Sequence, residues 1–430
     1  MIHVVAEHIG PRLQFACNLI FKHILKSEYQ LGTSSPAVSA ESTIIRYSRN
    51  KSGEGCWIKP SGLLEERGVK DFEVESVAWD DLNGLFPSEG DIPFDLFAAA
   101  FYLATRYEEY LPFRGDQHGR FPAQSSILFQ LDWLEEPVID QWVQKLREEY
   151  FSEHDRSQDS RSYSYVSTID IDSAFAYRYK GLMRSLGGFA KDISSGNWEN
   201  MRDRFKSISG VNEDPFYTYD LLHEWHQEFS TDVIYFFLLA DYGLNDKGVS
   251  YRSNHLQQLI RELADYHRIG IHPGYQSNKD VKQLESEVKR LEVISRREVE
   301  RSRQHFLMLR FPETYRRLLS LGVKEDYTMG YAAQPGFRAG TSNPFPFYDL
   351  EEENERPLMI YPFAVMDATL NMYMEKRPEE AIQLIKELEA KVRSVKGSFM
   401  TLWHNESLSE KWGWQGWREV YRETLKLAEK

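Results

Sequence analysis

The sequence predicts an α/β protein in which about seven strand–helix units form a (β/α) barrel, preceded in the chain by a smaller α+β domain. After residue 164, short apolar segments typical of strands alternate with longer segments typical of helices. Such alternation favours parallel strands joined by helical crossovers, and about seven units are enough to close a barrel. Before that point the pattern is mixed, and a polar stretch separates the two parts. An open doubly wound sheet is the alternative arrangement of the same units.

Three regions follow from this pattern. Residues 1–152 are predicted to form the N-terminal α+β domain, whose role the sequence does not indicate. Within it, residues 95–110 and 137–150 carry apolar side chains at helical spacing. Residues 153–164, EHDRSQDSRSYS, are rich in charge and serine without an apolar period, so we predict a linker there. Residues 165–430 form the predicted barrel.

The strands of the predicted barrel are apolar segments bounded by polar or turn residues. They comprise residues 165–171, 232–239, 268–272, 302–309, 323–328, 358–365 and 398–403. The clearest helix between them is 281–300, where Leu284, Val288, Leu291 and Ile294 fall on one stripe. In a parallel barrel the carboxyl ends of the strands meet on one face, and functional groups gather there.

Composition narrows the class of protein. The chain has 430 residues, a net charge of -14 and 41% hydrophobic residues, which indicates a globular protein and disfavours nucleic acid as a partner. Its two cysteines, Cys17 and Cys56, exclude a disulfide framework and a cysteine-based zinc site. No apolar run is long enough for a membrane span, and the N-terminus lacks the pattern of a leader peptide. We therefore expect a reduced, cytoplasmic protein, whose oligomeric state the sequence does not predict.

Two aspartates at the end of the first strand carry the sharpest functional signal. In the segment STIDID, Asp170 and Asp172 are two residues apart and so lie on the same strand face. Two carboxylates in one pocket repel each other unless a cation or a shared proton intervenes. A divalent metal resolves the conflict, because one aspartate can bind it while the other stays free as a general base. Two solvated acids at an exposed strand end are the alternative.

Other titratable residues fall at the ends of later strands. A histidine in the place of His272, at the end of the third strand, can ligate zinc through one nitrogen while a neighbour holds the other. His404 follows the seventh strand and is placed to protonate a leaving group. Arg303, in the fourth strand, can pair with the catalytic carboxylate and keep it ionised. A packed histidine or an ordinary salt bridge is the structural alternative for each. Further polar residues at strand ends are Asp241, His305, Asp326 and Asp367.

Three residues near these positions are predicted to bind substrate. Tyr275 lies in the turn HPGY after the third strand, and Trp403 directly precedes His404. Arg338 lies in the turn FRAGT, where lining the site and shaping the turn are equal alternatives. Aromatic side chains at such places suit stacking on sugars, although they equally suit core packing.

The order of these motifs resembles that of the polysaccharide deacetylases, carbohydrate esterase family 4. The segment TIDID looks like the first motif of that family, TFDD, which implies Asp170 as the base and Asp172 as a metal ligand. His272 looks like the first histidine of the HxxxH motif, Arg303 like the arginine that orients the base, and Leu402-Trp403-His404 like the motif with the acid histidine. The resemblance covers residues 165–430. It implies an incomplete (β/α) barrel and a divalent metal, zinc, held by one aspartate and two histidines. Either Asp326 or Asp367 orients His404.

The sequence departs from the family pattern at one metal ligand. Four residues after His272 the family has its second histidine, and here that position is Gln276. Glutamine is a poor zinc ligand. His305, two residues beyond Arg303 and on the same face of the predicted strand, is the candidate for the missing nitrogen.

The sequence thus predicts a metal-dependent hydrolase that removes acetyl groups from an N- or O-acetylated carbohydrate. Its predicted catalytic residues are Asp170, His404 and Arg303, and its predicted metal ligands are Asp172, His272 and His305. A barrel that has lost its metal and binds a glycan or a protein without chemistry is the alternative. A metal-free glycosidase is a third reading, which needs two carboxylates on opposite sides of the sugar, whereas Asp170 and Asp172 share one strand face.

Overall fold

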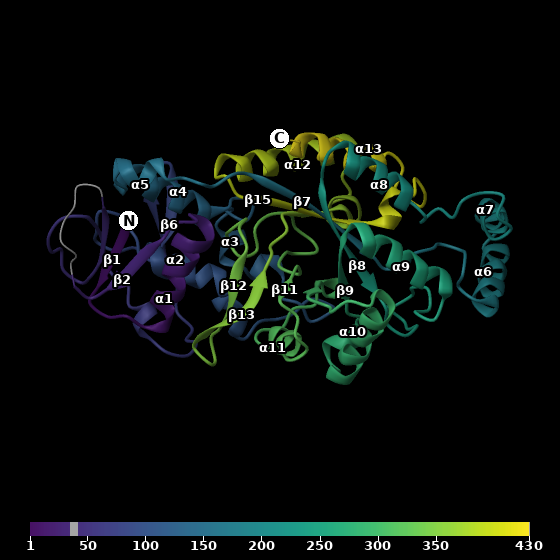
Figure 1. Cartoon of the computed structure of the whole chain (residues 1–430), viewed down its shortest axis with the longest axis horizontal. Helices are drawn as coiled ribbons and strands as arrows, with labels where there is room; N and C mark the ends of the chain where they lie inside the picture. The colour runs from purple at the N-terminus through teal and green to yellow at the C-terminus, as the bar shows by residue number, and fades with distance from the viewer. Residues whose placement is uncertain (35–41, 430) are drawn as a thin grey trace.

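The computed structural model describes residues 1–34 and 42–429. A nine-stranded sheet and a four-stranded sheet share one hydrophobic core that includes residues from Ile2 to Leu425. Figure 1 shows the N-terminal region, in purple and blue, at one end of the molecule. The helices α6 (Leu182–Ser194) and α7 (Trp198–Ile208) project from the opposite end. Over the described ranges, none of the helices is long and apolar enough to cross a lipid bilayer.

The N-terminal sheet is parallel throughout, with the strand order β2-β1-β3-β4. Its strands are β1 (Ile2–Ala6), β2 (Tyr29–Gly32), β3 (Thr43–Tyr47) and β4 (Cys56–Ile58). Helix α1 (Pro11–Cys17) and the π-helix η1 (Asn18–Ile24) join the first two strands, and the antiparallel hairpin of β5 (Ser76–Trp79) and β6 (Leu82–Leu85) follows the sheet. The α+β pattern predicted for this region is therefore corrected to a parallel α/β sheet with an added hairpin.

The two helices predicted in this region are present. Residues 95–110 contain α2 (Leu96–Ala104), and residues 137–150 contain α4 (Val138–Tyr150). Asp95 caps α2 by accepting a hydrogen bond from the backbone N–H of Ala98. Every residue of α2 is buried, because the helix is apolar on all sides. The shorter elements are η2 (Leu63–Glu65), η3 (Tyr107–Tyr110), η4 (Ala123–Ser125), α3 (Ile127–Gln130) and α5 (Glu153–Ser157).

The central sheet has the strand order β12-β13-β11-β10-β9-β8-β7-β15-β14. Its strands are β7 (Ser164–Ile171), β8 (Asp232–Leu238), β9 (Arg268–His272), β10 (Arg301–Ser302), β11 (Glu325–Asp326), β12 (Phe345–Asp349), β13 (Asn354–Ile360), β14 (Val365–Met366) and β15 (Ser398–His404). All neighbours pair in parallel except β12, which runs antiparallel to β13. Within the described residues the edge strands β12 and β14 do not pair with each other, so no closed barrel forms.

Three predicted strands differ from the observed ones. The fourth and fifth are cut to the two-residue strands β10 and β11. Residues 302–309 cannot form one strand, because Phe306 and Leu307 have positive φ angles of 60° and 53°. The sixth, 358–365, is divided between β13 and β14, with Pro362 in the gap between them. The predicted placement of Arg303 and His305 within one strand is therefore wrong.

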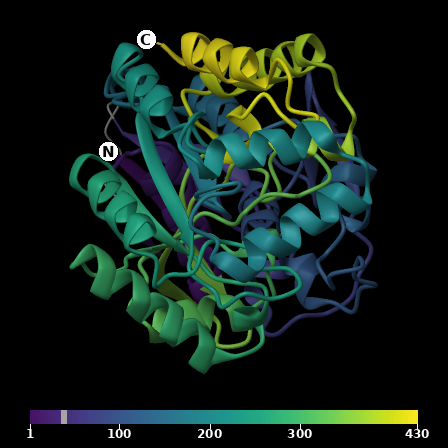
Figure 2. The ribbon, with the colours of Figure 1, turned by 90° about the vertical axis from the view of Figure 1, so that its right-hand side faces the viewer.

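Helices cover the outside of the central sheet (Figure 2). They are α8 (Tyr219–Glu228), α9 (Asn254–Tyr266), α10 (Val281–Ser295), α11 (Glu313–Ser320), α12 (Pro378–Ser394) and α13 (Trp417–Ala428). Helix α10 ends five residues before the predicted 300, because Arg296 takes up a left-handed conformation with φ of 58°. Short helices complete the fold: the 3-10 helices η5 (Gln276–Asn278), η6 (His305–Leu307) and η8 (Asn405–Leu408), and the π-helix η7 (Thr369–Tyr373).

Buried polar contacts join residues 1–152 to the central sheet. Arg338 donates two hydrogen bonds to Glu109, of 2.9 and 2.6 Å, and Arg106 donates to the same carboxylate at 2.8 Å. These three side chains are almost completely buried. Asp140, also buried, accepts from the hydroxyl and backbone N–H of Ser342 at 2.6 and 2.8 Å. Because a buried charge is stable only with its partner, these contacts tie the two parts together.

The segment predicted as a linker contains the short helix α5. Its Asp155 accepts a hydrogen bond of 2.7 Å from the N-terminal ammonium of Met1 and one of 2.9 Å from the backbone N–H of Thr43. The helix is therefore attached to the N-terminal sheet rather than extended between two parts.

Candidate active site

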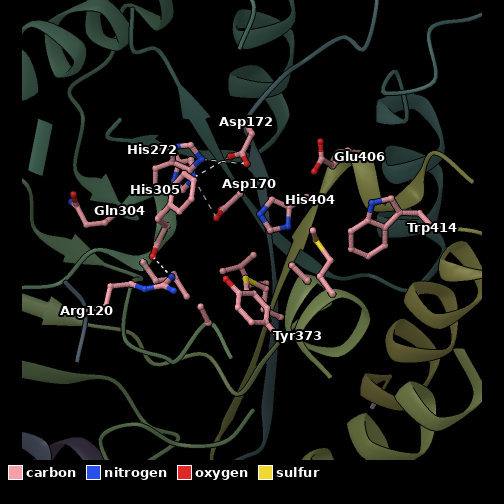
Figure 3. Close-up of a pocket in the computed structure, with 17 residues that line it drawn as sticks. Arg120, Asp170, Asp172, His272, Gln304, His305, Tyr373, His404, Glu406 and Trp414 are labelled. Carbon is pink, nitrogen blue, oxygen red and sulfur yellow. Dashed lines mark hydrogen bonds and ion pairs between the residues drawn. The ribbon is translucent and has the colours of Figure 1, made fainter. Parts of the chain in front are cut away.

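A cavity of about 430 Å³ opens at the carboxyl ends of the central strands (Figure 3). One side of it is polar and holds Asp170, Asp172, His272, His305 and His404. The remaining lining residues are Arg120, Gln304, Phe306, Leu307, Ala332, Met366, Ala368, Met372, Tyr373, Leu402, Glu406 and Trp414. Five of the predicted catalytic and metal-binding residues therefore face one space, while the sixth, Arg303, lies behind it.

Strand register explains how separate segments converge here. Strand β7 lies between β8 and β15, and in the β7–β15 register Asp170 stands opposite His404. His272 is the last residue of β9, the next strand beyond β8. Because parallel strands end at the same edge of the sheet, the side chains that follow them meet.

Asp172, His272 and His305 form a group in which one ligand atom from each residue lies within 4.8 Å of the others. His272 Nε2 is 3.2 Å from Asp172 Oδ1, and His305 Nε2 is 3.5 Å from Asp172 Oδ2. Asp172 Oδ1 is buried and makes no hydrogen bond to any residue in the described ranges. A buried carboxylate oxygen without a donor is costly in the absence of a cation.

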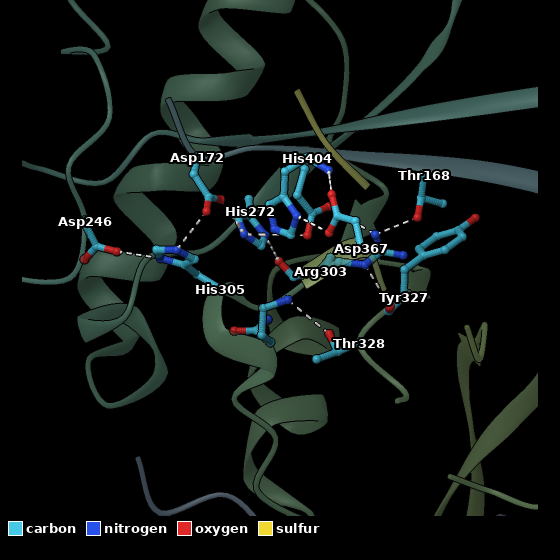
Figure 4. A network of polar contacts seen from close by, with 12 residues as sticks. Thr168, Asp172, Asp246, His272, Arg303, His305, Tyr327, Thr328, Asp367 and His404 are labelled. Atoms are coloured by element: carbon cyan, nitrogen blue, oxygen red, sulfur yellow. Dashed lines mark hydrogen bonds and ion pairs between the residues drawn. The ribbon is translucent and has the colours of Figure 1, made fainter. Parts of the chain in front are cut away.

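The other nitrogen of each histidine is held by a neighbour (Figure 4). His272 Nδ1 donates to the backbone carbonyl of Arg303 at 2.6 Å, and His305 Nδ1 donates to Asp246 Oδ1 at 2.8 Å. Both contacts leave Nε2 directed at the group, which is the usual arrangement around metal-bound histidines. Two imidazole nitrogens and one carboxylate oxygen are a donor set that suits zinc and leaves one coordination position open. The residues present therefore fit a divalent cation.

The electrostatics of the group follow from its burial. Burial lowers the pKa of His305, but the carboxylates of Asp172 and Asp246 raise it more, to about 9. Burial likewise raises the pKa of Asp172, while the imidazoles of His305 and His272 hold it well below its usual range. Asp172 and His305 thus form an ion pair, and a cation bound there would take the place of the proton on His305 Nε2.

Asp170 is paired with a buried arginine. Arg303 Nη1 donates to Asp170 Oδ1 at 3.1 Å and to the hydroxyl of Thr168 at 2.7 Å. Its Nε donates to the carbonyl of Tyr327 at 2.9 Å, and its guanidinium lies 4.8 Å from the ring centre of Phe236. Arg303 is fully buried and Asp170 is 2% exposed. The second oxygen, Asp170 Oδ2, lies 3.8 Å from His272 Nε2, beside the group of Asp172.

The two carboxylates that could orient His404 are now distinguished by position. Asp367 Oδ1 accepts from His404 Nδ1 at 2.8 Å, and Asp367 Oδ2 accepts from the backbone N–H of His404 at 2.7 Å. Asp326 instead accepts from the backbone N–H and hydroxyl of Thr328, both at 2.9 Å. Burial raises the pKa of Asp326 to about 6. Asp367, which follows β14, is the residue in contact with His404 because β14 pairs with β15.

The three predicted substrate-binding residues do not line the cavity. Trp403 is 1% exposed and packs against Tyr421, with ring centres 4.8 Å apart, so its ring cannot stack on a sugar. Arg338 is buried and committed to Glu109, although it lines a smaller adjoining cavity of about 90 Å³. Tyr275 packs its ring against Phe306 at 5.3 Å. Trp403 thus packs in the core, the guanidinium of Arg338 is held in an ion pair, and the half-buried Tyr275 packs against Phe306.

Several site residues have no counterpart in the sequence predictions. Asp246 and Arg120 come from loops, where no hydrophobic period marks a position, and Glu406 comes from the short helix η8. Tyr373 and Trp414 also lie outside the predicted strands. Burial, with the nearby carboxylate of Asp172, raises the pKa of Glu406 to about 7. The sequence signal that could have indicated Glu406 is its spacing, two residues after His404. Gln276, by contrast, is exposed in η5 and takes no part in the group.

Comparisons with known proteins complete this description. Residues 2–155 match the model of a family of unknown function, DUF7033. No curated protein matches the chain. A solved structure of a candidate polysaccharide deacetylase from Mycobacterium smegmatis is 16% identical over 63% of this chain and 84% of that one, with a TM-score of 0.41. The alpha-amylase AmyC from Thermotoga maritima is 10% identical over 74% of this chain and 69% of that one, with a TM-score of 0.27. Neither distant likeness carries an argument about activity, which rests on the site itself.

Proposed function

We propose that the chain is a metal-dependent hydrolase that removes acetyl groups from an N- or O-acetylated carbohydrate, with zinc as its metal. One observation carries the proposal. Asp172, His272 and His305 converge with both Nε2 atoms directed inward and one aspartate oxygen without a hydrogen bond in the described structure. A second carboxylate, Asp170, and a second acid–base group, His404, face the same cavity.

The metal would be held by Asp172, His272 and His305. When bound, a divalent cation supplies a Lewis acid for the acetyl carbonyl and lowers the pKa of water. Asp246 and the carbonyl of Arg303 hold the outer nitrogens of the histidines, so the ring orientations are set in advance.

Asp170 and His404 divide the proton transfers. Asp170, paired with Arg303, accepts a proton from water as the water oxygen forms a bond to the carbonyl carbon. His404 Nδ1 is committed to Asp367, so Nε2 carries the proton that goes to the leaving nitrogen or oxygen. The bond from the carbonyl carbon to that atom then breaks, releasing acetate and a free amine or alcohol.

The other side of the cavity supports a carbohydrate substrate. Apolar side chains also line the cavity, and we call them the apolar wall: the rings of Tyr373 and Trp414 and the side chains of Met372 and Leu402. A sugar ring has apolar faces and polar edges, and such mixed cavities bind it by stacking and by a few hydrogen bonds. The partly neutral Glu406 adds an acceptor and donor for hydroxyl groups.

Acetate release from acetylated chitooligosaccharides and O-acetylated glycans, measured after loading with zinc or cobalt, tests the proposal. We expect release by the wild type and its loss in Asp172→Asn, with the fold intact by circular dichroism. Asp241→Asn, at an exposed carboxylate outside the cavity, is the matched control and keeps full activity. Stoichiometric metal without release from any substrate of the panel would count against a deacetylase. Binding of glycans without metal or release would favour the non-catalytic alternative.

A further inference from the structure

A loop of the N-terminal region reaches the cavity. Arg120 is 9% exposed and lines the cavity on the side of His305, although it belongs to the part of the chain that precedes the central sheet. Its neighbour is the turn η6 (His305–Leu307), which begins with the candidate metal ligand His305. We call residues 116–120 the clamp loop.

The clamp loop holds itself together through one aspartate. Asp116 Oδ1 accepts from the backbone N–H groups of His118 and Arg120 at 2.9 and 3.0 Å. Its Oδ2 accepts from Arg120 Nε at 2.7 Å and forms an ion pair with Nη2, also at 2.7 Å. The guanidinium is thereby fixed before it touches the rest of the cavity, and Nη1 is left to point away from the loop.

Arg120 Nη1 donates to the backbone carbonyl of Phe306 at 2.7 Å. The ring of His118 packs on the ring of the same residue, with centres 4.9 Å apart. His118 Nδ1 also lies 3.3 Å from the hydroxyl of Tyr275, whose ring touches Phe306 from another side. The clamp loop therefore grips both the backbone and the side chain of Phe306.

Phe306 needs such support. It and Leu307 are consecutive residues with φ angles of 60° and 53°, a left-handed conformation that side chains other than glycine rarely adopt. A strained turn persists only where its surroundings hold it, and strain of this kind gathers at functional sites. One hydrogen bond within the turn, from the N–H of Leu307 to the carbonyl of Gln304 at 2.9 Å, closes it. The carbonyl of Phe306 points outward to Arg120.

Phe306 is in direct contact with His305, the residue before it in the turn. The two rings are in contact, with centres 4.6 Å apart, and His305 Nε2 lies 3.5 Å from Asp172. Metal ligands need to be held to within about half an ångström of their productive geometry. A turn that relaxed toward right-handed φ angles would carry the imidazole away from Asp172 and His272.

We propose that the clamp loop of the N-terminal region holds η6 in its left-handed turn and so fixes His305, with Arg120 as the positioning residue. The proposal rests on the proposed function in one respect, the role of His305 as a ligand. The clamp loop lies within residues 2–155, which match a family of unknown function. The proposal assigns this part of the region a role in the site, because the central sheet alone does not complete the cavity.

The test compares Arg120→Met with Arg114→Met, a change at an exposed arginine of the same segment, in the chain of 430 residues. Hydrogen exchange of the amides of residues 304–309 is measured first, without metal. We expect exchange there to rise in Arg120→Met and to be unchanged in Arg114→Met. Cobalt affinity is measured next, by competition with a chelator, together with the visible spectrum of the bound ion. We expect a loss of about tenfold or more in affinity and an altered spectrum in Arg120→Met alone.

The double variant Asp116→Asn/Arg120→Met separates two causes. If Arg120 acts through Phe306, the double variant stays as loose at residues 304–309 as Arg120→Met. Recovery of wild-type exchange in the double variant would show that the unpaired Asp116 caused the effect, and would overturn the proposal. So would unchanged exchange in a folded Arg120→Met. A wild type that binds no cobalt, but whose turn still loosens in Arg120→Met, would leave the clamp standing and defeat the proposed function instead.

Discussion

The carboxylate of Asp367 binds His404 twice, through the ring nitrogen Nδ1 at 2.8 Å and through the backbone N–H at 2.7 Å. One contact fixes the ring and the other fixes the strand end from which the ring projects. Asp367 therefore both orients the imidazole and raises its pKa, and Nε2 is left free to act in the cavity.

The first prediction concerns pH. Burial lowers the pKa of His404, but the carboxylates of Asp367, Asp172 and Asp170 outweigh it and raise that pKa well above the ordinary value. A raised pKa keeps the acid form of His404 populated to higher pH. In Asp367→Asn we expect this pKa to fall, so that the alkaline limb of kcat/KM moves to lower pH. The pH–rate profile checks this, with Asp241→Asn as the control. An alkaline limb in the same place would contradict it.

The same pair links stability to pH. Because the folded-state pKa of His404 is raised, its pairing with Asp367 contributes stability that is fully present below the unfolded pKa of about 6.5. That contribution is lost as pH rises through the folded pKa. We expect the difference in unfolding free energy between wild type and Asp367→Asn to narrow as pH rises above 6.5, measured by urea denaturation at several pH values. A difference in unfolding free energy that widens as pH rises would contradict the prediction.

The second prediction concerns the outer nitrogen of His305. Asp246 accepts from His305 Nδ1 and from the backbone N–H of Tyr275, and it is buried. Removal of such a partner typically weakens metal binding by about 10- to 100-fold. We expect Asp246→Ala to show this loss in a zinc competition assay. Asp265→Ala, at a 70% exposed carboxylate on α9, should bind zinc as the wild type does.

The third prediction concerns the buried pair of Arg303 and Asp170. Removing one partner leaves a buried charge unpaired, which costs about 3–5 kcal/mol. We expect Arg303→Met to lower the free energy of unfolding by about that amount, and Arg303→Met/Asp170→Asn to lower it by less than the sum of the single changes. Urea denaturation of the four proteins measures the coupling. Additive single changes would mean that the two charges do not stabilise each other.

The fourth prediction concerns the apolar wall. Tyr373 lines the cavity and is 47% exposed, so its truncation should leave stability nearly unchanged. Loss of one stacking contact, about 1 kcal/mol, corresponds to roughly a fivefold rise in KM. We expect this rise in Tyr373→Ala with kcat little changed. Tyr266→Ala, at a 76% exposed tyrosine outside the cavity, is the control, and an equal KM in both variants would argue against stacking.

The sequence was informative for Asp170, Asp172 and His272, which lie at the end of a strand or follow one directly. The alternation of strands and helices predicted the parallel central sheet, and the spacing of Asp170 and Asp172 predicted a shared face. His272 ends β9 as predicted, because an isoleucine-rich strand leads directly to it. These positions lie in strands or directly after them, and the pattern of apolar residues in a strand can be recognised in a single sequence.

Loops gave no such signal. His305 was assigned to a strand, yet it lies in a turn whose left-handed residues are set by contacts with Arg120 and His118. Asp246 reaches His305 from a loop whose course depends on the packing of the whole chain, whereas Asp367, directly after β14, was one of the two carboxylates predicted for His404. Trp403 was misassigned for the opposite reason, because neighbouring side chains of a strand point to opposite faces and the one beside His404 enters the core.

The buried contacts of Arg338 and Arg106 with Glu109 limit how the two parts of the chain can be exchanged between genes. A module that moves between genes must leave no unpaired charge on either side of the cut. Here Glu109 lies in the N-terminal region and Arg338 in the rest of the chain, so separating the two parts would leave each of these charges without the other. A recombinant that joins one part to a distant relative of the other therefore has to carry both sides of this network to avoid an unpaired buried charge.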